Sequence, residues 1–292
     1  MAQFKITVLC ENTALDARLA AEHGLCVLVE RGDDALLFDT GSSGAFLDNA
    51  RLLGKELSRV RAVALSHNHY DHTRGYLEFV KSYGVAHTLY MGREFYRTRG
   101  WDDAEQGYFH STSGPLSAAK LSELYADVRL LTADVTPVPG FEGASLLANI
   151  PRAVPFETVD ETNLRLAGGA WVVDDYADEL ALALDGGDEL AVLTGCAHTG
   201  VCSIVACAEA RLGKPVRAVI GGTHLVAFDA DRAQRTAEWL SAKRIPTVAA
   251  CHCTGPDASA LFSQLGFAQA GGGYSITFGR EESIPRGTAP SC

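Results

Sequence analysis

The sequence has little positive charge and no long apolar run. Lysine and arginine total 25 against 36 aspartates and glutamates, so the 292 residues carry a formal net charge of −11. Such an acidic balance disfavours nucleic acid and anionic membrane surfaces as partners, because both attract basic patches. No stretch approaches the ~18 consecutive apolar residues of a transmembrane helix, and the first residues do not resemble a signal peptide. We therefore expect a cytoplasmic protein that acts on a small molecule.

A compact disulfide framework is also missing. The eight cysteines are scattered over the whole chain, whereas small secreted domains cluster theirs. The sequence thus predicts a reducing compartment and mostly free thiols. Cys251 and Cys253 flank His252, and because side chains alternate along a strand, both are expected to point away from it.

What is present is an alternation of strand and helix patterns in two halves. The first half predicts strands at Lys5–Cys10, Leu25–Glu30, Ala35–Phe38 and Arg61–Leu65, and the second half at Glu189–Leu193, Val216–Ile220 and Thr247–Ala250. Helices are predicted at Ala45–Leu53, Gly75–Tyr83, Val201–Leu212 and Ala230–Ala242. Between the halves, residues 101–178 are too long for a plain connection and predict a lid or binding insert. We predict one domain, residues 1–292, rather than two independent units.

Histidines are few, yet three of the nine fall within one hexapeptide. His67, His69 and His72, together with Asp71, follow the apolar run Val60–Leu65 after one residue, Ser66. Imidazoles and a carboxylate presented at the end of one buried strand are suitable ligands for zinc, and also for manganese or iron. The alternative is a solvated polar loop. The spacing favours a metal site.

Each predicted strand of the second half ends close to another histidine. In open α/β folds, ligands bind beyond the carboxyl ends of the strands, so we expect His198, His224 and His252 to converge with Asp71. His198 and His252 are predicted to bind metal. His224 is either an active-site residue or a strand-end imidazole bonded to a backbone carbonyl.

Further candidates are less clearly marked. Cys196 either faces the metals or is an inert buried thiol. Asp39 either accepts the free N–H of a ligand imidazole or caps a turn. His23 and His87 are predicted to be structural or surface residues, and His110 could face the cleft from the insert.

The motifs resemble the metallo-β-lactamase superfamily. The resemblance rests on Phe38-Asp39-Thr40-Gly41, on Leu65-Ser66-His67-Asn68-His69-Tyr70-Asp71-His72-Thr73, and on the three later histidine motifs. Gly-Cys-Ala-His-Thr-Gly, Gly-Gly-Thr-His-Leu and His-Cys-Thr-Gly are similar to a subgroup labelled 7,8-dihydropterin-6-methyl-4-(β-D-ribofuranosyl)aminobenzene-5′-phosphate synthase.

Membership would imply an α/β fold, a four-layer αββα sandwich, with a dinuclear site at one edge. The ions would be two divalent metals, zinc first, with manganese or iron as alternatives. One would be bound by His67, His69 and His198, and the other by Asp71, His72 and His252. Cys196 stands where an aspartate bridges the metals in many members, and Arg74 where a glycine often follows the threonine.

The function that follows is a metal-dependent hydrolase, or a related metal-activated transferase, using a metal-bound water on a small anionic substrate. Asp71 would orient that water and His224 would supply a proton. Arg74 and Arg152 would bind the anion, and aromatic residues of the insert would clamp the substrate or simply pack: Trp101, Tyr108, Phe109, Phe141, Phe156 and Trp171. The alternatives are an iron-dependent redox enzyme on the same scaffold and a non-catalytic, metal-binding ligand sensor.

Overall fold

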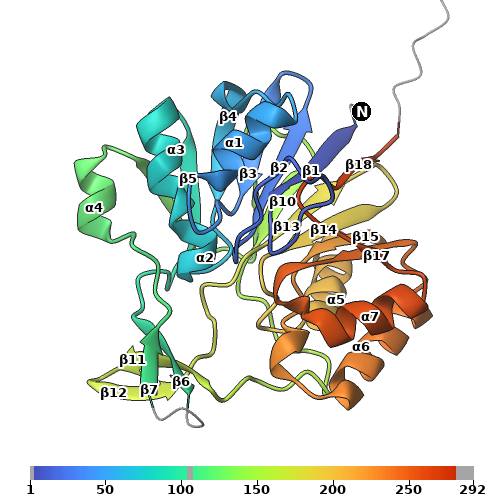
Figure 1. Ribbon diagram of the computed structural model, residues 1–292. Helices are drawn as coiled ribbons and strands as arrows, with labels where there is room; N and C mark the ends of the chain where they lie inside the picture. The colour runs from blue at the N-terminus through green and yellow to red at the C-terminus, as the bar shows by residue number, and fades with distance from the viewer. Residues whose placement is uncertain (1–2, 104–107, 281–292) are drawn as a thin grey trace, which may run out of the picture.

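Two seven-stranded sheets face each other, and helices cover their outer faces (Figure 1). The computed structural model describes residues 3–103 and 108–280. The first sheet has the order β18 (Ser275–Phe278), β1 (Phe4–Cys10), β2 (Cys26–Arg31), β3 (Asp34–Phe38), β4 (Val60–Ala64), β5 (Thr88–Gly92) and β8 (Asp127–Leu131). The second has the order β17 (Ala268–Gln269), β16 (Thr247–Ala250), β15 (Val216–Gly221), β14 (Leu190–Thr194), β13 (Ala181–Asp185), β10 (Ala144–Leu147) and β9 (Val135–Pro137).

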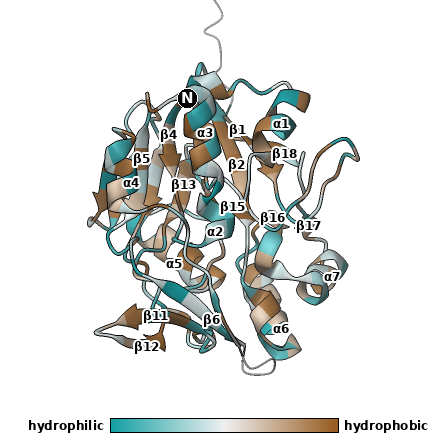
Figure 2. Cartoon of the chain, turned by 60° about the vertical axis from the view of Figure 1, so that its left-hand side comes forward, coloured by the Kyte–Doolittle hydropathy of each residue, from teal (hydrophilic) through white to brown (hydrophobic). Residues whose placement is uncertain are grey.

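The helices divide between the two sheets. Those that pack on the first sheet are α1 (Ala45–Leu52), α3 (Gly75–Tyr83) and α4 (Ala118–Glu123), and those on the second are α5 (Val201–Leu212), α6 (Ala230–Ala242) and α7 (Pro256–Gln264). A single turn, α2 (Tyr70–Thr73), precedes α3. In Figure 2 helices such as α1 and α6 carry both hydrophilic and hydrophobic colours, as expected for helices with one face on a sheet. No helix within residues 3–103 and 108–280 is both long and apolar enough to cross a bilayer.

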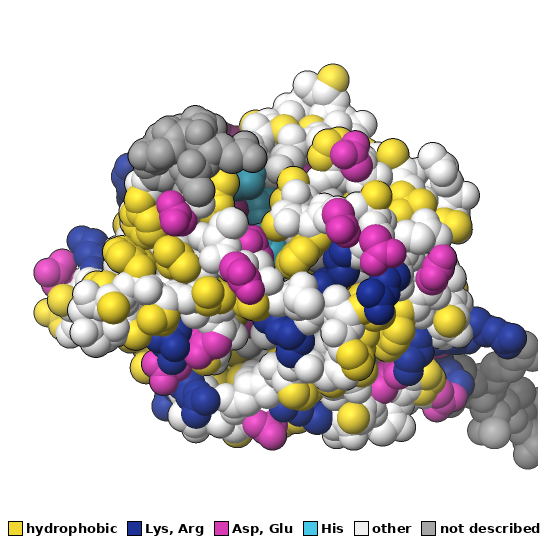
Figure 3. Space-filling view, turned by 90° about the horizontal axis from the view of Figure 1, so that it is seen from below, with side chains coloured by type: hydrophobic (Ala, Val, Ile, Leu, Met, Phe, Trp, Pro, Cys, Tyr) yellow, Lys and Arg dark blue, Asp and Glu magenta, His cyan; other side chains and the backbone are white. Residues whose placement is uncertain are grey.

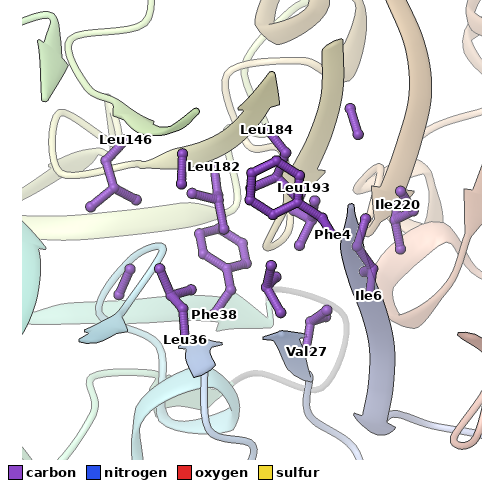
Figure 4. Close-up of a cluster of buried hydrophobic side chains, with 14 of the residues drawn as sticks. Phe4, Ile6, Val27, Leu36, Phe38, Leu146, Leu182, Leu184, Leu193 and Ile220 are labelled. Carbon is purple, nitrogen blue, oxygen red and sulfur yellow. The ribbon is translucent and has the colours of Figure 1, made fainter. Parts of the chain in front are cut away.

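Three apolar clusters lie between the four layers, one between the two sheets and one between each sheet and its helices. Because strand side chains alternate between faces, Leu36 and Phe38 of β3 enter the core between the sheets, while Leu37 packs under the helices of the first sheet. A third cluster lies between the second sheet and α5, α6 and α7. Figure 4 shows the central core, where residues from both sheets meet: Phe4, Ile6, Val27, Leu36, Phe38, Leu146, Leu182, Leu184, Leu193 and Ile220. The predicted αββα sandwich is confirmed.

The predicted elements agree with the observed ones to within one residue at each end. Helices α3, α5 and α6 and strand β16 have the predicted bounds, and a glycine directly follows each of the first two helices. The seven cysteines in the described part of the chain are free and buried. Cys292 lies outside the described residues.

The region from 101 to 178 is less uniform than predicted. It contributes β8 to the first sheet and β9 and β10 to the second. A separate four-stranded sheet, ordered β12 (Ala170–Val173), β11 (Asn163–Ala167), β6 (Arg99–Asp103) and β7 (Tyr108–Ser111), lies at the lower end of the molecule in Figure 1. Only this small sheet stands apart from the sandwich, and its role as a lid stays a prediction.

Candidate metal centre

The loops that follow several parallel strands meet at one edge of the sandwich. Strand β4 leads to His67, β14 to His198, β15 to His224 and β16 to His252. Their side chains line or adjoin a cavity of about 890 Å³, which also borders the small four-stranded sheet. Figure 3 shows histidine side chains at the bottom of this hollow. The predicted convergence of the four motifs is therefore observed.

One cluster, the His67 group, consists of His67, His69 and His198. Nε2 of His67 lies 3.3 Å from Nε2 of His198. The ring of His69 lies 4.5 Å from that of His67 and 5.1 Å from that of His198, centroid to centroid. Burial lowers the pKa of all three imidazoles well below the usual range. They are therefore neutral, which is the form that binds a metal.

The second cluster, the Asp71 group, consists of Asp71, His72 and His252. Nε2 of His72 lies 3.1 Å from Nε2 of His252, and Oδ2 of Asp71 lies 3.3 Å from the latter atom. Burial disfavours the charged form of His72, but the carboxylates of Asp39 and Asp71 outweigh it and raise the pKa of His72 to about 9. Burial likewise opposes ionisation of Asp71, yet His72 and the other nearby imidazoles lower the pKa of Asp71 well below its usual value. This pocket favours a positive charge, which a proton or a metal cation can supply.

Hydrogen bonds outside the two groups fix which ring nitrogen carries the proton. Oδ2 of Asp39 accepts from Nδ1 of His72 at 2.7 Å and from the hydroxyl of Ser66 at 2.7 Å. Because Ser66 gives its proton to Asp39, its oxygen accepts from Nδ1 of His67 at 2.8 Å. On the other side, Oδ1 of Asn12 accepts from Nδ1 of His252 at 2.9 Å. In the neutral form of these three histidines, Nε2 is thereby the nitrogen that carries the lone pair.

This arrangement fits divalent cations. Lone pairs that face each other across 3.1 Å in the Asp71 group repel unless a positive charge lies between them. In the His67 group, Nδ1 of His198 is buried without a hydrogen-bond partner among the described residues. Imidazoles next to a carboxylate and a thiol form a donor set that zinc accepts, and manganese or iron to a lesser degree.

Cys196 lies between the two groups. Its Sγ clusters within 4.8 Å with ring nitrogens of His67 and His198, and likewise with those of His72 and His252. The distance from Sγ to Nε2 of His72 is 3.2 Å. Burial raises the pKa of the Cys196 thiol well above its usual value, so a neighbouring cation is needed to hold it as the thiolate that binds metal.

His224 lines the same cavity, with its ring centroid 4.1 Å from that of His198. Its Nε2 hydrogen-bonds Oδ2 of Asp160 at 3.2 Å. Burial opposes protonation, but this bond to Asp160 and the nearby Cys253 raise the pKa of His224 to about 9. The imidazole thus lies at the cavity wall and is bonded to a carboxylate rather than to a backbone carbonyl.

Cys253 corrects one prediction. Its Sγ lies within 4.8 Å of the donor atoms of Cys196 and His224 and lines the cavity. The predicted alternation fails because β16 ends at Ala250 and residues His252–Thr254 form a 3-10 turn. Cys251 does point away, into the core between the sheets.

The three remaining histidines differ in their relation to the cavity. His23 is exposed, as predicted, yet its Nε2 reaches Oδ2 of Asp71 at 3.1 Å, a contact that the sequence did not suggest. His87 is buried away from the cavity and bonds the hydroxyl of Tyr76 at 3.0 Å. His110, on β7, lines the cavity and stacks on Trp101.

Neither arginine assigned to substrate lines the cavity. Arg74 is exposed and its guanidinium lies over the ring of Tyr70 at 4.9 Å. Nη1 of Arg152 donates to the backbone carbonyls of Thr158 and His198, at 3.3 and 3.0 Å. Arg152 thus holds the His198 loop, and a substrate role for either arginine stays a prediction.

Of the aromatic residues proposed as a clamp, Trp101 lines the cavity. Phe141 is part of the core between the sheets, and Phe156 packs against the cluster of the second sheet. Phe109 and Trp171 pack on each other with centroids 4.5 Å apart, outside the cavity. The side chain of Tyr108 lies outside the described residues.

Several supporting residues carried no recognisable sequence signal. The carboxylate of Glu179 accepts the backbone N–H groups of His198 and Thr199 at 2.6 and 2.8 Å. Fully buried Arg99 binds Asp178, whose carboxylate accepts the backbone N–H of Asn68 at 3.1 Å. Glu179 thus holds the loop of His198, and Asp178 holds the loop that contains His67 and His69. The residues that make these contacts are distant from the loops in the sequence and belong to no short motif.

Comparison with known proteins agrees with this geometry. The family model of the metallo-beta-lactamase superfamily matches residues 20–212. A curated relative from Methanocaldococcus jannaschii, named 7,8-dihydropterin-6-methyl-4-(beta-D-ribofuranosyl)-aminobenzene-5′-phosphate synthase, is 27% identical over 270 residues, covering 89% of this chain and 90% of the relative. A second relative from the same organism, an uncharacterized protein, is 26% identical over 270 residues, which cover 89% of this chain and 94% of that relative.

Solved structures with the same fold include a metal-dependent hydrolase of the beta-lactamase superfamily. It superposes with a TM-score of 0.79 at 24% identity, covering 95% of this chain and 100% of the other. Zinc-bound PqqB from Methylobacterium extorquens superposes with a TM-score of 0.54 at 12% identity, covering 93% of this chain and 99% of PqqB. From the family model, the four layers and the clustered motifs together, the chain belongs to the metallo-beta-lactamase superfamily.

Proposed function

We propose that this protein is a metal-dependent hydrolase acting on an electrophilic carbonyl or phosphoryl centre of a small substrate. One observation carries the proposal. Within each group two imidazole Nε2 atoms face each other, at 3.1 Å in the Asp71 group and at 3.3 Å in the His67 group. The sulfur of Cys196 is close to both groups, beside a cavity large enough for a small molecule. The donor set favours zinc, with manganese or iron as alternatives.

The proposed ligands are His67, His69 and His198 for one ion, and Asp71, His72 and His252 for the other, with Cys196 shared. When bound, divalent cations lower the pKa of a coordinated water toward ~7 and polarise the substrate oxygen. Asp39 holds His72 directly and His67 through Ser66, so one carboxylate orients a ligand in each group.

Two side chains are proposed to handle protons and solvent. Asp71 has its Oδ2 at the cavity wall beside His23 and His252, where it can orient the attacking water. His224, in the loop after β15, lines the cavity and can give a proton to the leaving group. The hydrogen bond to Asp160 keeps the imidazole of His224 in place. The two residues belong to different loops, since Asp71 follows β4 and His224 follows β15.

The substrate is proposed to carry its negative charge at the end that faces the metals. Among the described residues, no lysine or arginine lines the cavity, so cations bound there and His224 would be the main positive charges. The far wall offers Trp101, His110 and Asp102, which suit a planar, hydrogen-bonding group. The relative's name contains a 5′-phosphate, which agrees with an anionic substrate.

A transferase is the second candidate. The same activated centre can pass a group to an acceptor other than water, and the curated relative is named a synthase. We further propose that the chain forms one domain, because the central core takes side chains from both halves. A cytoplasmic location is proposed from the seven free thiols of the described residues.

The experiment begins with the metal content of protein purified without added metal. Zinc or manganese at two ions per chain is the expected result, and a coloured iron protein would favour the redox alternative. Turnover is then screened on phosphodiester, phosphomonoester, lactone and thioester substrates, with and without chelator. If fully metal-loaded protein turns over none of them but binds such ligands, the sensor alternative replaces the hydrolase.

A further inference from the structure

The proposed reaction leaves one cavity thiol, Cys253, without a task. The sulfur atoms of Cys253 and Cys196 lie within 4.8 Å of each other. The thiol of Cys253 donates to the backbone carbonyl of Cys196 at 3.4 Å. The two residues are far apart in sequence and meet because the loops after β14 and β16 leave the same edge of the second sheet.

Both thiols are open to a small reagent that enters the cavity. Although each residue is largely buried, both line the cavity wall. None of the other five cysteines of the described chain lines it. Access therefore distinguishes this pair from the rest.

The surroundings of Cys253 keep its sulfur in place. The backbone N–H of His224 donates to Sγ of Cys253 at 3.3 Å. A Cβ at position 222 would come within 2.5 Å of the same sulfur, so the space exists because Gly222 has no side chain. The imidazole of His224, bonded to Asp160, lies beside the pair.

We propose that Cys196 and Cys253 form a reversible oxidation site for hydroperoxides. The sulfur of Cys196 gives up its thiol proton and attacks the peroxide oxygen, the O–O bond breaks, and Cys196 becomes a sulfenic acid, while the released proton completes the water or alcohol to which the peroxide is reduced. The thiol of Cys253 then attacks that sulfur, an S–S bond forms and water leaves. Two thiols lose two electrons in total, one peroxide takes both, and a dithiol reverses the change.

The consequence for the metal centre rests on the proposed function. In the disulfide, the sulfur of Cys196 is bonded to Cys253 and is no longer a thiolate between the His67 and Asp71 groups. Bound metal should then be released and turnover lost until the disulfide is reduced. The modification itself does not depend on turnover.

The test treats metal-loaded protein with hydrogen peroxide at a low molar excess, alkylates the remaining thiols and maps the peptides by mass spectrometry. The expected product is a peptide linked through Cys196 and Cys253, which disappears after dithiothreitol treatment. A chromogenic chelator follows metal release in the same sample. Alkylation of both cysteines to the same extent before and after peroxide would overturn the proposal.

Two variants sharpen the test. In Cys253→Ser, no partner can resolve the sulfenic acid, so Cys196 should proceed to the sulfinic acid and dithiothreitol should no longer restore the protein. Cys207→Ser, in α5 outside the cavity, should behave as the wild type. Equal recovery of Cys253→Ser and wild type would contradict the proposal.

The Cys10 and Cys26 pair provides an internal reference within the wild-type protein. These residues are register partners on β1 and β2, but they lie under the first-sheet helices, and burial raises the pKa of Cys10 to about 12. They should stay reduced, and preferential oxidation there would also contradict the proposal. If the Cys196–Cys253 disulfide forms while metal and turnover are retained, the oxidation site stands and the shared position of Cys196 in the proposed centre fails.

Discussion

The His67 group and the Asp71 group adjoin the same cavity but are supported differently. In the Asp71 group each member has a polar partner of its own: His72 bonds Asp39, His252 bonds Asn12, and Asp71 contacts His23. In the His67 group, His67 bonds Ser66, and Nε2 of His69 reaches the hydroxyl of Tyr176 only at 3.4 Å. His198 instead stacks on Tyr176 at a centroid distance of 3.6 Å, and its Nδ1 has no hydrogen-bond partner among the described residues.

The two groups also differ in charge. Two carboxylates, those of Asp39 and Asp71, lie next to His72, and they raise its pKa although burial acts against them. The three imidazoles of the His67 group are kept neutral by burial. For a divalent cation, the Asp71 group would therefore be a negatively charged, preorganised site, and the His67 group a neutral, less constrained one. We infer that the Asp71 group binds metal more tightly and fills first.

The largest effect is expected from removing a ligand on either side. His252→Ala should empty the Asp71 group and His67→Ala the other, and each should lower kcat/KM by about 10³-fold, since a metal contributes several kcal/mol to the transition state. Metal analysis of each variant, together with turnover, checks this. His87→Ala, a buried histidine outside the cavity, is the matched control. Full metal content and full turnover in both ligand variants would refute the assignment of the site.

A smaller loss of turnover is expected from substitution of His224, which belongs to neither the His67 group nor the Asp71 group. His224→Gln keeps a hydrogen-bonding side chain but cannot carry the proton, so kcat should fall by about 10²-fold. Both metals should remain, because the two groups are unchanged. Metal analysis next to the pH dependence of kcat separates this role from a structural one. If the variant loses metal in proportion to its activity, His224 is a ligand rather than a proton donor.

Substitution of the residues that hydrogen-bond the proposed ligands tests the difference between the two groups directly. Asp39→Asn removes a charge that serves both groups and should weaken metal binding on both sides, by roughly 10- to 100-fold. Asn12→Ala should weaken only the Asp71 group, because its contact is with His252. Chelator competition, with the two binding steps resolved, measures the difference. Equal weakening of both steps by Asn12→Ala would show that the two sides are not independent.

Much of this arrangement could be predicted because its signals are local. Strand Arg61–Leu65 followed by His67, His69, Asp71 and His72 has both a periodicity and a ligand spacing, and each later histidine follows an apolar run. Such patterns determine which strand ends carry donors. The parallel order of β14, β15 and β16 then brings three of those ends to one edge of the sheet.

The supports and the Cys253 thiol could not be predicted in the same way. Glu179 and Asn12 act through hydrogen bonds between loops that are distant in the sequence, so no spacing in the chain marks them. Cys253 was misplaced because strand alternation was extended past Ala250, where the backbone turns. The bond from Arg152 to the backbone carbonyl of His198 could not be predicted either, since nothing in the sequence shows whether a cation near a proposed site binds a substrate or a backbone carbonyl.

The smallest expected effect isolates what burial alone does to a histidine. His87 is buried like the His67 group but has no metal-binding partner, and burial lowers its pKa to about 4. Above the unfolded-state pKa of ~6.5 both states hold a neutral ring, so the full stability is present. As the pH falls from there toward 4, only the unfolded state takes up the proton, and stability is lost.

Between about pH 7 and 4.5 the wild type should therefore lose about 2 kcal/mol more unfolding free energy than His87→Gln, which has no titrating ring. Urea unfolding of chelator-treated protein at both pH values measures the difference, and pairing each variant with wild type at the same pH cancels the other groups. Gln can still bond the hydroxyl of Tyr76, so the comparison at pH ~7 reports any loss unrelated to titration. An unchanged difference across this range would mean that burial does not hold His87 neutral. The neutral character ascribed to the His67 group would then need another cause, because its pKa shifts have the same origin.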